Sequence, residues 1–103
     1  MSASPEFREF LQEHLGRLGE LRFKRMFGGA AVYLHEMIFG LIFGEVLYLK
    51  TTPETVALFE AAGSEPFTYM AKGKSVSLRY WRMPDEAMDD RDEAERWVRI
   101  ALG

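Results

Sequence analysis

The spacing of apolar residues predicts a helix at the start of the chain. From residue 5 to residue 18 they recur every three or four positions, which is the period of one helical face. Ser4 precedes the stripe as an N-cap, and Pro5 suits the first helical position. We expect His14 at the edge of the core, since no second metal ligand lies at helical spacing. The stripe consists of Phe7, Phe10, Leu11, His14, Leu15 and Leu18.

The next thirty residues carry the pattern of a sheet. Four apolar or alternating stretches, 21–26, 30–35, 37–43 and 46–50, follow one another with very short connections. Strands this close in sequence pair antiparallel through tight turns. The pattern therefore predicts a four-stranded antiparallel meander.

The third strand of this meander, residues 37–43, is apolar on both sides, which is typical of a central strand covered on both faces. Strict alternation places Phe39, Leu41 and Phe43 on one side. Three short helices can cover only one face of a small sheet, so a homodimer through the sheet or its edge is expected to cover the other. The alternatives are that the second helix wraps around, or that the sheet curls over its own residues. The candidate interface residues are Tyr33, Phe39, Leu41 and Phe43.

The second half of the chain returns to helical spacing, with a hairpin inserted. Thr51 and Thr52 are candidate caps for a helix that ends at Gly63, and Thr51 and Glu54 have capping-box spacing. Strands over 67–71 and 75–83 follow, joined by a tight turn. A last helix, capped by Asp90, carries Trp97 on its apolar side as an expected core residue. The predicted fold class is α+β in two layers: helix, four-strand antiparallel meander, helix, β-hairpin, helix.

Gly28 and Gly29 stand between the first two predicted strands. Paired glycines suit a backbone with φ > 0 or a very close neighbour, so we predict a structural turn or bulge here. No helix pattern follows, and the spacing differs from phosphate-binding glycine motifs.

Composition excludes several function classes but does not identify one. The 103 residues are expected to form one domain, residues 1–103, and the sequence has no cysteine and a net charge of −3. From Pro84 onward seven acids oppose three arginines. The first residues lack the pattern of a signal peptide, and no apolar run is long enough to span a membrane, so a cytoplasmic protein is expected. A metal or cofactor is not expected.

Two other function classes compete with a binding module. Only His14 and His35 could act as bases at neutral pH, and no activated nucleophile or carboxylate pair is visible, so an enzyme is not expected. Nucleic-acid binding is the alternative, since basic and aromatic residues are interleaved in the predicted strands. The acidic net charge argues against it, and the aromatic residues could equally be core. The candidate basic and aromatic surface comprises Lys24, Arg25, Lys72, Lys74, Arg79, Trp81 and Arg82, with Tyr33, Tyr69 and Tyr80 nearby in the pattern.

Four segments resemble the N-terminal domain of the TfoX/Sxy family, in order and in spacing, over nearly the whole chain. They are residues 25–30 (RMFGGA), 47–50 (LYLK), 63–69 (GSEPFTY) and 77–84 (SLRYWRMP). The resemblance implies an α+β fold of the secretion-chaperone-like type. Two-domain members are regulators of bacterial competence genes, thought to act with the cyclic-AMP receptor protein. Since this sequence ends at Gly103, their C-terminal domain is not expected. The family supplies no catalytic residues.

These observations together predict a non-enzymatic protein-interaction or regulatory module with no cofactor. A homodimer and a protein partner in transcription regulation are expected, while nucleic acid remains the alternative ligand.

Overall fold

The computed structural model describes residues 4–26 and 28–103. Its element order confirms the predicted α+β fold, with a 3-10 turn after the first helix and a short helix before the last one. The elements are α1 (Pro5–Leu15), η1 (Gly16–Leu18), β1 (Leu21–Met26), β2 (Gly29–Leu34), β3 (Met37–Phe43), β4 (Val46–Lys50), α2 (Pro53–Ala61), β5 (Pro66–Ala71), β6 (Lys74–Arg82), α3 (Asp85–Asp89) and α4 (Arg91–Leu102).

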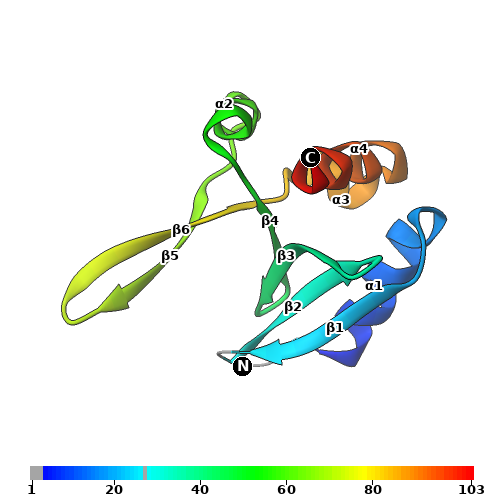
Figure 1. The fold of residues 1–103 in the computed structure, drawn as a ribbon, viewed down its shortest axis with the longest axis horizontal. Helices are drawn as coiled ribbons and strands as arrows, with labels where there is room; N and C mark the ends of the chain where they lie inside the picture. Colours follow the sequence, from blue (N-terminus) through cyan, green and yellow to red (C-terminus); the bar gives the residue numbers. More distant parts are fainter. Residues whose placement is uncertain (1–3, 27) are drawn as a thin grey trace.

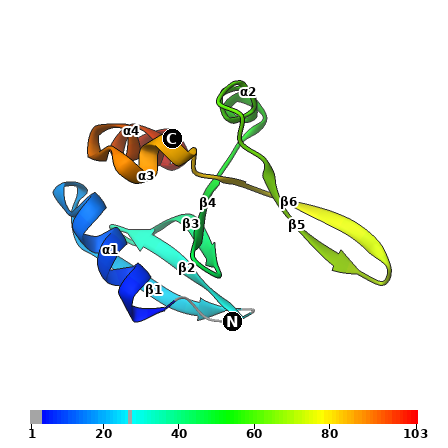
Figure 2. The same cartoon turned by 180° about the vertical axis from the view of Figure 1, so that it is seen from behind.

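The strands form one antiparallel sheet in the order β1-β2-β3-β4-β6-β5. The meander and the hairpin are both present, and β6 rather than β5 joins them by pairing with β4. The helices pack on one face of this sheet (Figure 1). Beyond β4 the sheet bends, so the β5–β6 hairpin projects away from the helices (Figure 2). No helix covers the other face of the sheet, which lies between the β1–β4 meander and the hairpin. No helix among the described residues is long and apolar enough to cross a membrane.

The core lies between the helices and the sheet. The ring centroids of Phe59 in α2 and Trp97 in α4 are 4.6 Å apart, so two helices distant in sequence meet over the sheet. Trp97 is 4% exposed, which confirms its predicted place in the core. The largest fully buried side chains are Phe39, Phe59, Leu11, Leu15, Ile42, Leu47, Leu49, Met83, Val32 and Val98.

A register shift between Val32 and Tyr33 changes which side chains of β3 face the helices. Gly40 is opposite Val32, but Ile38 rather than Phe39 is opposite Tyr33, so β3 has one extra residue at this point. Such a bulge reverses the alternation on one side of it. Phe39 is therefore fully buried in the core, and the prediction that it shares a face with Leu41 and Phe43 is wrong.

The predicted caps of the first and last helices are confirmed, and the cap of α2 lies one residue later than predicted. Ser4 accepts a hydrogen bond from the Phe7 N–H, and Asp90 caps α4. The capping box of α2 lies one residue later than the predicted Thr51–Glu54 box, because Thr52 and Thr55 exchange the two hydrogen bonds. Thr51 is instead buried, and its hydroxyl donates to the Arg79 carbonyl oxygen at 3.0 Å.

Gly28 and Gly29 lie at the predicted turn between β1 and β2. Each position requires glycine for a different reason. Gly28 has a φ of 77°, which other residues rarely adopt. Gly29 is buried in β2, where a Cβ atom would overlap the carbonyl oxygen of Ile42 and the ring of Phe43.

We predict that Gly29→Ala lowers the free energy of unfolding by more than ~1 kcal/mol, because a backbone atom of β3 occupies the space that the methyl group needs. Chemical denaturation measures this loss. Gly16→Ala is the control, since Gly16 has helical dihedral angles and its nearest obstacle is a flexible side chain. It should be neutral, or stabilise by about 0.4–1 kcal/mol. A Gly29→Ala variant as stable as the parent would refute the close approach of β2 and β3.

Candidate interaction surface

The face of the sheet opposite the helices, here called the open face, is defined by strand register. Residues directly opposite one another in an antiparallel ladder point to the same face. One row of such partners crosses five strands on the open face. It consists of Lys24, Ala31, Leu41, Tyr48 and Arg82.

Aromatic rings gather on this face where the hairpin bends over the meander. The ring centroids of Phe43 and Phe67 are 4.4 Å apart and stacked. Tyr48 meets Phe67 edge-on at 5.0 Å, and Tyr69 lies 6.3 Å from Phe67. Beside these rings is a cavity of about 570 Å³, here called the aromatic hollow, which is lined by Phe43, Phe67, Tyr69 and Leu78. Its volume falls within the range of small-ligand sites.

Curling of the sheet shields part of the predicted interface. Leu41 is only 4% exposed, although no helix covers it, so its own neighbours on the open face bury it. Tyr33 is half-buried, and the guanidinium of Arg22 lies over its ring at 5.2 Å from the centroid. Phe43 is also half-buried, at the aromatic hollow. The alternative in which the sheet covers its own residues therefore accounts for Leu41.

The predicted basic and aromatic residues divide between the two faces. Lys24 and Arg82 belong to the open face by register, and Lys74 joins them because it is opposite Ala71, two residues from Tyr69. Lys72 lies in the hairpin turn. Three residues face the helix side instead: Arg25 opposite Ala30, Trp81 opposite Leu49, and Arg79, which alternates with Trp81. Trp81 packs against the core, so its predicted place on a binding surface is wrong.

Arg82, one of the cations of the open face, forms two ion pairs. Arg82 contacts Asp85 at 2.9 Å and Glu65 at 3.7 Å. This arginine therefore connects the end of β6 to α3 and to the start of β5, and its charge is largely balanced by its own chain.

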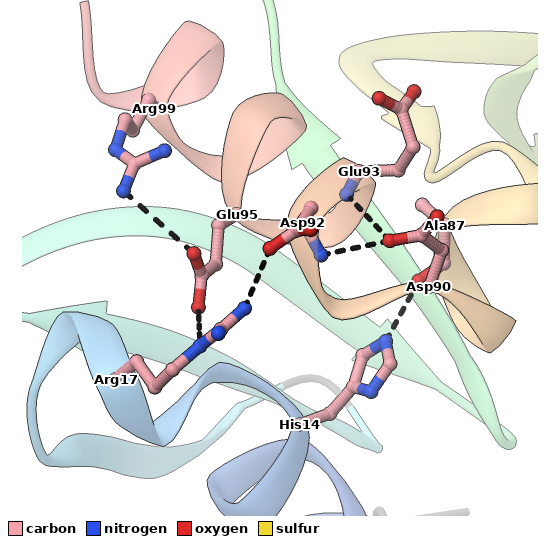
Figure 3. Close-up of polar contacts among 8 residues, drawn as sticks. All are labelled: His14, Arg17, Ala87, Asp90, Asp92, Glu93, Glu95 and Arg99. Atoms are coloured by element: carbon pink, nitrogen blue, oxygen red, sulfur yellow. Dashed lines mark hydrogen bonds and ion pairs between the residues drawn. The ribbon is translucent and has the colours of Figure 1, made fainter.

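A polar cluster joins the end of α1 and the turn η1 to α3 and α4 (Figure 3). His14 is buried, and its Nε2 lies 2.7 Å from the Ala87 carbonyl oxygen. The Nε of Arg17 donates to Glu95 at 2.7 Å and its terminal nitrogen donates to Asp92 at 2.8 Å. These bonds raise the pKa of Arg17, the one to Glu95 most strongly. The cluster is accounted for by helix packing, and no group of three metal-binding side chains occurs within residues 4–26 and 28–103.

Sequence reasoning missed several residues of this surface. Phe67 and Leu78 were read only as strand residues, although they line the aromatic hollow with Phe43. Lys50 was not among the predicted basic residues, yet it lies opposite Tyr80 on the open face. The missing information was the pairing of β4 with β6, which no local pattern predicts.

Tyr80, on the open face, has a phenol whose pKa is changed by burial. Burial raises the pKa of Tyr80 above its ordinary value of 10.0, and the neighbouring Tyr33 raises it further. Tyr33 belongs to β2 and Tyr80 to β6, so the effect of Tyr33 on Tyr80 fits a sheet curled around this face.

We predict that Tyr80 ionises later than a free tyrosine in an alkaline titration followed by phenolate absorbance. Since the folded chain then holds this proton more tightly than the unfolded chain, stability from Tyr80 is complete below about pH 10 and is lost as pH rises through the folded pKa. Tyr80→Phe should remove the late ionisation and reduce the alkaline loss of stability. An unchanged upper titration in Tyr80→Phe would show that Tyr80 is not shielded.

Comparison with known proteins gives two matches. The profile of the TfoX N-terminal domain family matches residues 13–103. Protein Sxy of Escherichia coli (strain K12) is 27% identical over 77 residues, which are 75% of this chain and 36% of Sxy. The chain thus corresponds to about a third of that curated relative. Because the family profile covers most of the sequence, the chain belongs to the TfoX N-terminal domain family.

Proposed function

We propose that the chain is a non-enzymatic interaction module with a regulatory role, and that it self-associates through strand β5. Membership in a family of competence-regulator-like proteins supports the regulatory part. The observation that carries the interaction part is the contrast between the two edges of the sheet.

The edge strand β1 is protected and the edge strand β5 is not. Charged side chains on an edge discourage pairing with another chain. β1 carries three bases in six residues, whereas β5, with the sequence PFTYMA, carries no charge. Two large apolar residues of β5 are exposed, Tyr69 at 43% and Met70 at 69%. An uncharged edge with exposed apolar side chains favours the addition of a strand from a partner.

The same strand of a second copy is the partner that fits this edge. Pairing of β5 with its two-fold mate would continue the sheet from one subunit to the other, and neither edge brings a charge into the contact. A face-to-face dimer through the open face is less favourable, because it would bring Lys24, Lys50 and Lys74 of one copy towards those of the other. The homodimer proposed here therefore uses the edge of the sheet and leaves the open face accessible.

The polar chemistry of the described residues supports a role without catalysis. His14 is engaged with the Ala87 carbonyl oxygen inside the helix layer. His35 is exposed in the turn between β2 and β3, on a different element from His14.

We predict that light scattering at micromolar concentration gives a mass about twice 11.9 kDa, because edge pairing forms a dimer. Met70→Lys should shift the mass towards 11.9 kDa by placing a charge on β5. Met37→Lys is the matched control, since Met37 is an exposed methionine on β3, and it should remain dimeric. A parent protein with a mass of 11.9 kDa would refute the dimer, and equal effects of the two variants would refute the β5 contact.

A further inference from the structure

Charge is segregated between the sheet and the rest of the chain. The six strands contain seven of the 13 lysines and arginines and none of the 16 aspartates and glutamates. The strands thus carry +7, while the remaining six bases and 16 acids give the helices, turns and loops −10. The net charge of −3 conceals this division, and the acidic balance of the whole chain is no guide to the open face.

The lysines account for the free positive charge on this face. All four, Lys24, Lys50, Lys72 and Lys74, belong to the sheet or its hairpin turn and are exposed. Three of them lie on the open face: Lys24 opposite Ala31, Lys50 opposite Tyr80, and Lys74 beyond Tyr69. Among residues 4–26 and 28–103, no lysine forms an ion pair, whereas Arg17, Arg82 and four other arginines do.

The carboxylates nearest this face lie in turns and at strand ends, and two of them are already paired. Glu36 contacts Arg22 at 3.8 Å, and Glu65 contacts Arg82 at 3.7 Å. Glu45 lies in the turn between β3 and β4, where it accepts a hydrogen bond from Ser4. The strands themselves present only lysine, arginine and phenol groups to a ligand on the open face. A lysine ammonium group donates hydrogen bonds and accepts none.

This combination of features describes the chemistry of the ligand. Three unpaired ammonium groups on one face suit a ligand with several anionic oxygens. The aromatic hollow, about 570 Å³ and lined by Phe43, Phe67, Tyr69 and Leu78, suits a flat apolar group on the same ligand. Tyr69 is 43% exposed at the hollow, so part of its ring is free for stacking.

We propose that the open face binds single-stranded nucleic acid, with Lys24, Lys50 and Lys74 contacting phosphates and a base entering the aromatic hollow beside Tyr69. Cationic grooves that carry aromatic stacking platforms are the general means of binding single strands. A duplex keeps its bases paired and stacked and could not place one in the hollow. An acidic peptide is the less fitting ligand, because its backbone N–H donors would find no carboxylate on these strands.

The test is fluorescence anisotropy with a labelled oligothymidylate of about 12 nucleotides, measured from low to moderate salt. Each phosphate contact on a single strand contributes about −0.7 to the slope of log K against log salt. Three contacts predict a slope of about −2. The triple variant Lys24→Ala, Lys50→Ala, Lys74→Ala should remove most of this slope and weaken binding at least tenfold at low salt.

The double variant Arg25→Ala, Arg79→Ala is the matched control, because it removes two strand bases on the helix-side face. Its affinity should stay within about twofold of the parent. Tyr69→Leu keeps an apolar side chain but removes the ring, and should weaken binding about fivefold or more with the salt slope unchanged. Unchanged thermal unfolding verifies that the variants are folded, and the monomeric Met70→Lys variant separates this site from the dimer.

Four results would overturn the proposal. They are no binding at the lowest salt, an equal loss in the triple and double variants, equal competition by a duplex of the same length, and stronger competition by a glutamate-rich peptide that contains phenylalanine. The last result would assign the open face to an acidic protein segment instead.

Discussion

Burial of the helices' apolar stripes against one face of the sheet is the interaction on which the rest of the structure depends. Phe59 of α2 and Trp97 of α4 meet at 4.6 Å over that face, and the sheet presents Phe39 and Ile42 to the same core. Since the helices all lie on this side, the opposite face must be shielded by its own curvature. Curling of the sheet buries Leu41 among its neighbours on the open face, and the aromatic hollow lies on the same face beside Phe43 and Phe67.

The one-sided arrangement also separates charge. Helices of a two-layer fold expose one polar side to water, and in this chain those exposed sides carry the acids, with Asp92 and Glu93 in the first turn of α4 where the helix dipole favours them. The open face is the one on which no helix packs, and it carries three of the four lysines. A protein with a net charge of −3 thereby gains a cationic surface of its own. The net charge alone does not reveal this surface, because it requires the pairing of strands that are distant in sequence.

Local signals in the sequence predicted the elements well, because caps, glycines and apolar spacing act within a few residues. Ser4, Asp90 and Gly28 each lie where those signals place them. The predictions that failed, for the faces of Phe39 and Trp81, depended on pairing between strands. The bulge opposite Val32 moved Phe39 into the core, and the pairing of β6 with β4 turned Trp81 towards the helices. Neither register is encoded in a local period, and a slip of one residue exchanges the faces.

The assignment of side chains to the two faces of the sheet is the claim on which the open face depends. The most direct measurement compares the free energies of unfolding of Phe39→Ala and Phe43→Ala, two phenylalanines four residues apart on β3. Phe39 is fully buried in the core, so its loss should cost about 3–5 kcal/mol. Phe43 is half-buried and stacked on Phe67, and its loss should cost about 1–2 kcal/mol. Equal costs, or a larger cost at Phe43, would contradict the bulge and with it the division of the sheet into a core face and an open face.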